Sequence, residues 1–256
     1  MIERIIEIVK VAGAYTRYRR DSVTITVKED SSLITNVDME VDSLLKNELS
    51  KTFSRINFYN EEGGGKREGK VFILDPIDGT NNFIKNVGSY TISVGYGEFT
   101  ESGFVSEIGV VYDCVENKIY YAQRDKGAKL LNLIKGQISD ICVSNNFDLS
   151  EYVIAFGCPY NKHRNDEIFS LIKKLQDKAF DIKRIGPASA DICKVAEGRL
   201  DGYIEFDLHL WDIAAAQIIL EEAGGRLSVL GKSADKIDII VAGDMAIEFI
   251  LEMIIE

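Results

Sequence analysis

Apolar residues recur with two different periods along the first half of the chain. In residues 2–18 they fall on one face of a helix, whereas in residues 23–27 they alternate with polar residues as in a strand. A capping box that begins at Thr35 predicts a second helix, which ends near Leu49. Strand-like stretches follow closely after it, and the short loops between the later ones favour antiparallel pairing. These stretches are residues 56–59, 71–74, 89–99, 104–112 and 117–122.

The pattern changes near residue 145, where strand-like runs begin to alternate with helical runs. The expected strands are 152–156, 180–185, 202–206 and 237–241, and the expected helices are 165–176, 188–197, 212–223 and 244–255. Such alternation is typical of α/β folds. We therefore predict an N-terminal α+β subdomain, residues 1–145, and a C-terminal α/β subdomain, residues 146–256, which together form one functional unit.

The stretch VFILDPIDGTNNF, residues 71–83, carries the most specific chemistry. Its short apolar beginning predicts a buried strand, and we expect this strand to stop at Asp75-Pro76 because proline lacks a backbone N–H. The turn Asp78-Gly79-Thr80 can open a helix whose first N–H groups would accept an anion. Two carboxylates so close repel each other unless a cation lies between them, which favours a divalent metal that faces a phosphate. An isolated D-P-x-D-G would more often be an ordinary turn.

Four further acids stand where a metal site could use them, although each has an ordinary structural explanation. Glu61 and Glu62 follow a predicted strand, and two strands that end at the same edge of a sheet would bring Glu61 beside Asp75. The ordinary explanation is that acids before a glycine run belong to a solvated loop. Asp38 lies in the first turn of its helix, where it would also favour the helix dipole. Asp212 opens a helix of small residues, where an Asp is normally an N-cap.

The string DPIDGTNNF resembles the signature of the inositol monophosphatase family, magnesium-dependent and lithium-sensitive phosphatases that include certain fructose-1,6-bisphosphatases. WDIAAA, residues 211–216, resembles the family's second signature. Asp38, Glu61-Glu62 and Gly186-Pro187-Ala188 also match the family in the right order, so the resemblance spans most of the chain. It implies a layered α-β-α-β-α sandwich of the inositol monophosphatase and fructose-1,6-bisphosphatase type, with α+β and α/β parts.

The resemblance also implies a role for each matching residue. The metal ligands would be the side chains of Glu61, Asp75, Asp78 and Asp212 and the backbone carbonyl of Ile77. Thr80 and Asp38 would orient and activate the attacking water as a pair, and Glu61 would be the third catalytic residue. The amides of Gly79 and Thr80 would hold the phosphate, and Ala188 and Glu205 would lie against the leaving group.

The activity implied by the resemblance is that of a phosphomonoester hydrolase with two or three Mg²⁺ ions per active site and a metal-activated water as nucleophile. Lys183 stands where the family commonly has an arginine, and Asn60 stands where it often has a glycine. These departures do not determine which leaving group the enzyme would prefer. Lys183 and Arg184, helped by Arg164 or Lys162, could hold a distal phosphate. We therefore expect inositol 1-phosphate, fructose 1,6-bisphosphate or both as substrates.

Other functions stay open at this point. A 3′-phosphoadenosine 5′-phosphate phosphatase of the same superfamily is disfavoured because no aromatic cluster offers an adenine platform. A catalytically silent metal- or phosphate-binding regulator would be expected to lose a ligand, Thr80 or Asp38, yet all are present. A haloacid-dehalogenase-type phosphatase uses a similar D-x-D-G-T loop, in which the two aspartates are two residues apart. Asp75 and Asp78 are three residues apart, which argues against this class.

Composition limits the remaining possibilities. The 256 residues carry a net charge of −11, which argues against general nucleic-acid binding. The four scattered cysteines favour reduced thiols, and the charged N-terminus and the lack of a long apolar run predict a cytoplasmic protein without a signal peptide or membrane span. The family implies a homodimer. It also implies that the polar loop 28–33 closes over a metal site, so we expect this loop to be poorly ordered without metal.

Overall fold

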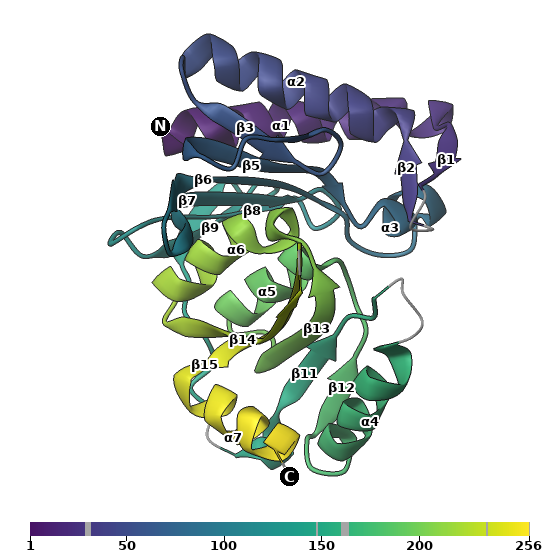
Figure 1. The fold of residues 1–256 in the computed structure, drawn as a ribbon, viewed down its shortest axis with the longest axis vertical. Helices are drawn as coiled ribbons and strands as arrows, with labels where there is room; N and C mark the ends of the chain where they lie inside the picture. Colours follow the sequence, from purple (N-terminus) through teal and green to yellow (C-terminus); the bar gives the residue numbers. More distant parts are fainter. Residues whose placement is uncertain (29–31, 147, 160–163, 234, 256) are drawn as a thin grey trace.

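The computed structural model describes residues 1–28, 32–146, 148–159, 164–233 and 235–255. Figure 1 shows helices and sheets in alternating layers: α1 and α2, a large sheet, α5 and α6, a smaller sheet, and finally α4 and α7. The α-helices are α1 (Ile2–Arg19), α2 (Asn36–Thr52), α3 (Thr80–Lys85), α4 (Asn165–Gln176), α5 (Ala188–Ala196), α6 (Leu210–Glu222) and α7 (Asp244–Ile255). This arrangement confirms the predicted α-β-α-β-α sandwich.

The large sheet has eight strands in the order β10-β9-β8-β7-β6-β5-β3-β4. Neighbouring strands are antiparallel except β3 and β5, which run parallel. The strands are β3 (Asn57–Asn60), β4 (Gly64–Gly65), β5 (Gly69–Asp78), β6 (Thr91–Thr100), β7 (Gly103–Asp113), β8 (Lys118–Gln123), β9 (Ala128–Asn132) and β10 (Gln137–Asp140). One face packs on the apolar stripes of α1 and α2, where Val9 and Leu45 are fully buried. A small hairpin, β1 (Ile25–Val27) and β2 (Leu33–Thr35), precedes α2.

The smaller sheet has five strands in the order β12-β11-β13-β15-β14. Its strands are β11 (Val153–Phe156), β12 (Asp181–Lys183), β13 (Gly202–Leu208), β14 (Gly225–Ser233) and β15 (Lys236–Gly243). The strands β11, β12 and β13 are parallel, as the alternation with helices predicts, but β15 runs antiparallel to both β13 and β14. The sheet is therefore mixed. The chain passes from one sheet to the other between Asp140 and Val153, and the division into two subdomains at residue 145 stays a prediction.

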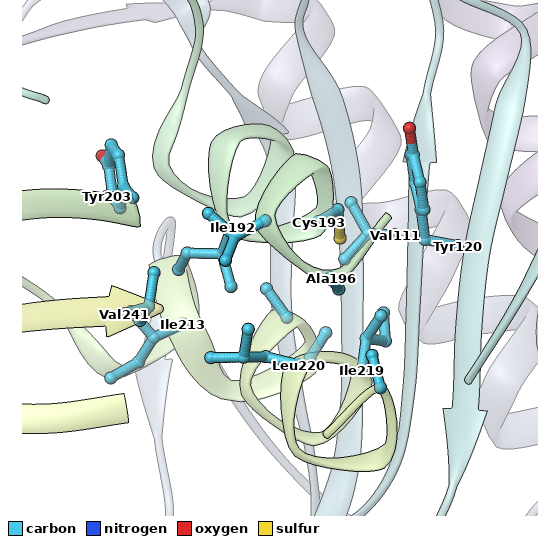
Figure 2. Close-up of a cluster of buried hydrophobic side chains, with 14 of the residues drawn as sticks. Val111, Tyr120, Ile192, Cys193, Ala196, Tyr203, Ile213, Ile219, Leu220 and Val241 are labelled. Atoms are coloured by element: carbon cyan, nitrogen blue, oxygen red, sulfur yellow. The ribbon is translucent and has the colours of Figure 1, made fainter. Parts of the chain in front are cut away.

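The layer between the sheets holds α5 and α6 in a large apolar cluster. Figure 2 shows Ile192 and Ala196 of α5, Leu220 of α6 and Val111 of β7 among the side chains of this cluster. The small residues of α6 allow it to approach the large sheet closely: a Cβ on Gly109 would lie 2.1 Å from the carbonyl oxygen of Ala215. The close packing fixes the position of the first turn of α6, which carries Asp212.

Strand β5 continues through Pro76 to Asp78, so the predicted stop at Asp75-Pro76 is wrong. Its pairing with β6 shifts from Asp75 opposite Ser93 to Asp78 opposite Thr91, which inserts one extra residue. A bulge tolerates a proline because it leaves one backbone N–H out of the ladder. In a regular strand, side chains three residues apart point to opposite faces. The bulge therefore lets both carboxylates face the same side.

Among the described residues, no helix combines the length and the apolar composition that crossing a bilayer would require.

Candidate metal centre

Three carboxylates meet where the large sheet faces the layer of α5 and α6. One ligand atom from each of Asp75, Asp78 and Asp212 lies within 4.8 Å of the others. Asp75 is only 1% exposed. The first two come from the bulge of β5 and the third from the first turn of α6, so residues more than 130 positions apart converge on one point.

The parallel pairing of β3 and β5 brings Glu61 beside this cluster. Asn60 lies opposite Leu74, and the backbone N–H of Glu61 donates to the Leu74 carbonyl at 3.3 Å. The chain therefore leaves β3 beside Asp75, as the sequence predicts. After burial, the charge of Glu61 contributes to the raised pKa of Asp75.

Asp212 combines its cap with its place in the cluster. Its Oδ2 accepts a hydrogen bond of 2.6 Å from the backbone N–H of His209, which is the residue before α6. The helix begins at Leu210, so Asp212 is its third residue and not the expected N-cap; its carboxylate forms half of a capping box with His209. This role does not exclude a second use, because a carboxylate has two oxygens and about four lone-pair sites.

Asp38 and Thr80 lie beside the carboxylates as a hydrogen-bonded pair. Asp38 is fully buried, and its Oδ2 accepts from the backbone N–H of Thr35 at 2.9 Å and from the Thr35 hydroxyl, which confirms the capping box. The Thr80 hydroxyl is 3.1 Å from Asp38 Oδ1 and equally far from the carbonyl oxygen of Ile77. The Ile77 carbonyl, expected as a metal ligand, thus lies next to Thr80.

Electrostatics of the cluster favour bound cations. Burial first, and then the neighbouring carboxylates, raise the pKa of Asp75 well above its usual range, and the pKa of Asp212 is raised for the same reasons. Burial raises the pKa of Asp78 to about 6, although hydrogen bonds from Ser189 oppose the shift. Carboxylate and carbonyl oxygens are hard ligands of the kind that magnesium prefers. The residues present therefore fit divalent metal ions.

Lys28 supplies a cation that the sequence did not suggest for this place. Its Nζ lies 2.7 Å from Glu61 Oε1 and 3.2 Å from Glu62 Oε1. Burial opposes the charged form, but the two glutamates outweigh it and raise the pKa of Lys28. Lys28 begins the predicted mobile loop 28–33, of which residues 29–31 lie outside the described residues. The ammonium group holds Glu61 in place and would compete with a metal ion for it.

The phosphate turn at Gly79 packs against the opposite half of the chain. Gly79 has a φ of 89°, a left-handed conformation that glycine adopts without strain, and it precedes α3. A Cβ at this position would lie 3.1 Å from the side chain of Pro187, the residue before α5. The N-terminal turn of α3 thus faces the N-terminal turn of α5, and Gly79 and Ala188 line the same cavity.

This cavity of about 570 Å³ opens between α3, α4 and α5 and reaches Asp78 and Asp212. Its walls include Ala188, Glu205 and Arg184, three of the residues expected to contact the leaving group. Burial, followed by the charges of Asp78 and Asp191, raises the pKa of Glu205 to about 7, although a hydrogen bond from the Tyr203 hydroxyl opposes the shift. A second cavity of about 710 Å³, lined by Lys28 and Lys236, shares Glu205 and Asp212 with the first.

The other basic residues expected around the leaving group are already paired or not described. Lys183 is not among the residues that line the two cavities and forms an ion pair with Asp181. Arg164 binds Asp238 at 2.8 Å and Asp207 at 3.1 Å, so its charge is neutralised within the protein. Lys162 lies outside the described residues.

Sequence reasoning missed two other neighbours of the site. Trp211 lines the larger cavity, stacks on His209 with ring centroids 4.4 Å apart and also contacts Tyr59. Ser189 hydrogen-bonds Asp78. Ser189 lies next to Ala188 in the matched segment, which was the one signal in the sequence that could have pointed to it.

The layered sandwich and the acidic cluster at its centre, which could bind metal, are those of a family of phosphatases. The chain belongs to the inositol monophosphatase family, whose sequence model matches residues 1–248. It is 33% identical to the Nus factor SuhB of Pasteurella multocida over 211 residues, which are 81% of this chain and 75% of that protein.

Two solved structures resemble the fold over almost the whole chain. An IMPase of Thermotoga maritima has a TM-score of 0.85 and 27% identity, with 97% of this chain and 94% of that chain covered. The extragenic suppressor protein suhB of Bartonella henselae has a TM-score of 0.87 and 23% identity, with coverages of 98% and 97%.

The raised pKa values predict that magnesium stabilises the protein more at high pH than at low pH. Asp78 and Glu205 bind protons more tightly in the folded chain, so their contribution to stability is complete below the unfolded pKa values near 4 and is lost as the pH rises through about 6 and 7. Magnesium should replace the proton of Asp78, which is one of the expected metal ligands. We expect the melting temperature in magnesium, relative to EDTA, to rise by roughly 5–10 °C near pH 8 and by much less near pH 5.

Differential scanning fluorimetry from about pH 5 to pH 8 measures this difference. Sodium chloride at matched ionic strength is the control, because general screening of the net charge of −11 would also stabilise the protein. A magnesium effect that did not change with pH, or that sodium chloride reproduced, would contradict the prediction.

Proposed function

We propose that the protein is a magnesium-dependent phosphomonoester hydrolase that acts on small polyol or sugar phosphates. The observation that carries the proposal is the cluster of Asp75, Asp78 and Asp212, with Glu61 at the end of the neighbouring strand, beside the Asp38–Thr80 pair. When bound, divalent cations neutralise the negative charge of the phosphoryl oxygens and lower the pKa of water at the site. Phosphoryl transfer needs little else than positioning and charge stabilisation.

The residues of the chain have separate tasks in this proposal. Thr80 accepts a hydrogen bond from the attacking water while its own hydroxyl proton is directed to Asp38. The amides of Gly79 and Thr80, at the start of α3, bind the phosphoryl oxygens. On the opposite wall, Glu205 accepts hydrogen bonds from hydroxyl groups of the leaving group. Two or three magnesium ions, inhibition by lithium, a homodimer and a cytoplasmic location complete the proposal.

The proposed substrates are inositol 1-phosphate, fructose 1,6-bisphosphate or both. Arg184 lines the leaving-group cavity and supports a contact with a second phosphate, whereas Lys183 would have to leave Asp181 to contribute. Release of inorganic phosphate from both compounds, with magnesium and with EDTA, tests the activity. Release from neither compound in magnesium would contradict the proposal.

If Arg184 and Lys183 hold a distal phosphate, the double variant Lys183→Ala, Arg184→Ala should lower kcat/KM for fructose 1,6-bisphosphate about tenfold or more and leave that for inositol 1-phosphate nearly unchanged. Arg199→Ala is a matched control, because Arg199 pairs with Glu116 away from the site. Equal losses for both substrates would show that the two residues do not hold a distal phosphate.

The structure supplies one argument for the alternative, a 3′-phosphoadenosine 5′-phosphate phosphatase. Phe169, Val87 and Ile185 are exposed large apolar residues, and all three line the leaving-group cavity. An aromatic surface at this position could stack on a base, which weakens the sequence-based objection to nucleotides. Phe169→Ser should then lower kcat/KM for 3′-phosphoadenosine 5′-phosphate more than for inositol 1-phosphate.

A non-catalytic regulator is a further alternative, because curated relatives of the chain are named Nus factor SuhB. The complete carboxylate set and the Asp38–Thr80 pair favour catalysis, because a silent regulator has no need of both. Magnesium binding without release of phosphate from any of the three compounds would favour the regulator.

A further inference from the structure

Asp78 occupies a position where the backbone alone does little to orient its side chain. It follows the bulge of β5 and precedes Gly79, which is left-handed. The ladder pairing on its N-terminal side is interrupted, and α3 begins on its C-terminal side. A carboxylate in such a place needs contacts from another element if its two oxygens are to be held in different directions.

Ser189, the second residue of α5, provides these contacts. Its backbone N–H donates to Asp78 Oδ2 at 2.9 Å, and its hydroxyl donates to the same oxygen at 2.6 Å. Ser189 is completely buried. The positive end of the α5 dipole also faces the carboxylate there, which strengthens both hydrogen bonds. Two donors from the second half of the chain therefore hold one oxygen of a residue in the first half.

Thr91 fixes the direction of the serine hydroxyl. The hydroxyl oxygens of Thr91 and Ser189 are 2.6 Å apart, and Thr91 is completely buried and lies opposite Asp78 in the pairing of β5 with β6. An ionised carboxylate only accepts hydrogen bonds, so the Ser189 proton points to Asp78 and Thr91 donates to the Ser189 oxygen. The chain Thr91–Ser189–Asp78 thus has a single consistent order of donors.

We propose that Ser189 is a positioning residue for metal binding: it holds Asp78 Oδ2 so that Oδ1 faces Asp75 and Asp212 as the oxygen offered to the metal. Among the described residues, none donates a hydrogen bond to Oδ1, whereas Oδ2 receives two. The inference rests on the metal site of the proposed function. Hydrogen-bonding partners of metal ligands commonly contribute a factor of 10–100 to metal affinity.

The test is the affinity of the metal-free protein for magnesium, measured by isothermal titration calorimetry. Ser189→Ala keeps the backbone donor and removes the hydroxyl, so we expect the magnesium Kd to rise roughly tenfold. The kcat at saturating magnesium should stay within about threefold of the wild-type value, because excess metal restores occupancy. Ser189→Thr, which keeps the hydroxyl, should restore the affinity.

Two further variants separate positioning from general stability. Thr91→Val keeps the shape but removes the donor to Ser189, so it should weaken magnesium binding less than Ser189→Ala does. Ser106→Ala is the matched control. Ser106 is a buried serine of β7 in the large sheet, and its hydroxyl donates to the Ala214 carbonyl at 3.0 Å. The control variant should lower the melting temperature and leave the magnesium Kd unchanged.

A Ser189→Ala protein that melts like Ser106→Ala and binds magnesium like the wild type would overturn the inference. The binding measurement does not require catalysis, so the two proposals fail separately. A wild-type protein that binds magnesium but hydrolyses no phosphate ester would contradict the proposed function and leave the positioning role of Ser189 intact.

Discussion

Replacing Asp75 by Asn should remove magnesium-dependent phosphate release and, in the absence of metal, make the protein more stable. The Asp75 carboxylate is 1% exposed, and burial and the charges of Glu61, Asp78 and Asp212 raise its pKa well above the usual range. At pH 8 a neutral amide of the same shape relieves this repulsion, and its oxygen can still accept the 3.1 Å hydrogen bond from the Ile77 N–H.

The same change takes a charged oxygen ligand from the site. Metal ions contribute several kcal/mol to stabilisation of phosphoryl-transfer transition states, and each 1.4 kcal/mol is a factor of ten, so we expect turnover to fall at least about 10²–10³-fold. Thermal melting in EDTA and phosphate release in magnesium measure the two effects on one preparation. Loss of activity through misfolding would instead lower the metal-free stability.

Asp113→Asn is the matched control for this experiment. Asp113 is as buried as Asp75, but its Oδ1 accepts hydrogen bonds from the backbone N–H groups of Val115 and Glu116 in a turn. The control should keep its turnover and gain no stability in EDTA. An Asp75→Asn protein with turnover within about tenfold of the wild type would exclude Asp75 as an essential ligand.

Local signals in the sequence predicted the elements that carry the site. The capping box at Thr35 placed Asp38 in the first turn of α2, and its two reciprocal hydrogen bonds are present. The prediction that two strands end at one edge placed Glu61 beside Asp75, and the parallel pairing of β3 with β5 produces this arrangement. Such signals succeed because a cap or a strand end depends on a few neighbouring residues.

Features that depend on distant partners could not be predicted in the same way. The bulge of β5 exists only in its pairing with β6, so a local rule about proline gave a strand that ended too early. Strands β9, β10 and β14 were missed because much of their surface is exposed or partly exposed, which leaves a weak apolar alternation. The antiparallel position of β15 likewise depends on its partners β13 and β14.

Charged residues show the same limit at the site itself. Arg164 reads in the sequence as a free cation near the substrate, but Asp207 and Asp238, more than 40 residues away, neutralise it. Lys28 reads as part of a solvated loop, yet its ammonium group contacts Glu61. Residue type and position in the chain identified the carboxylates, whereas the pairing of the basic residues is a property of the folded chain.

Replacing Thr80 by Ala should lower turnover about 10²–10⁴-fold, the usual contribution of a group that transfers or directs a proton, and leave magnesium affinity nearly unchanged. The Thr80 hydroxyl donates toward Asp38 Oδ1 at 3.1 Å, and Asp38 is held by Thr35, so the pair is fixed before substrate binds. Alanine removes this hydroxyl but none of the carboxylate ligands.

Thr80→Ser keeps the hydroxyl in the same place and should therefore retain most of the turnover, which separates loss of the hydroxyl from loss of the methyl group. The double variant Asp38→Asn, Thr80→Ala should lose less turnover than the two single losses combined, because both changes disable one hydrogen-bonded pair. Calorimetric titration with magnesium accompanies the kinetics of each variant. If Thr80→Ala weakened magnesium binding as strongly as Asp75→Asn does, the threonine would be a support of the metal site, and the attacking water would have to be oriented by another residue.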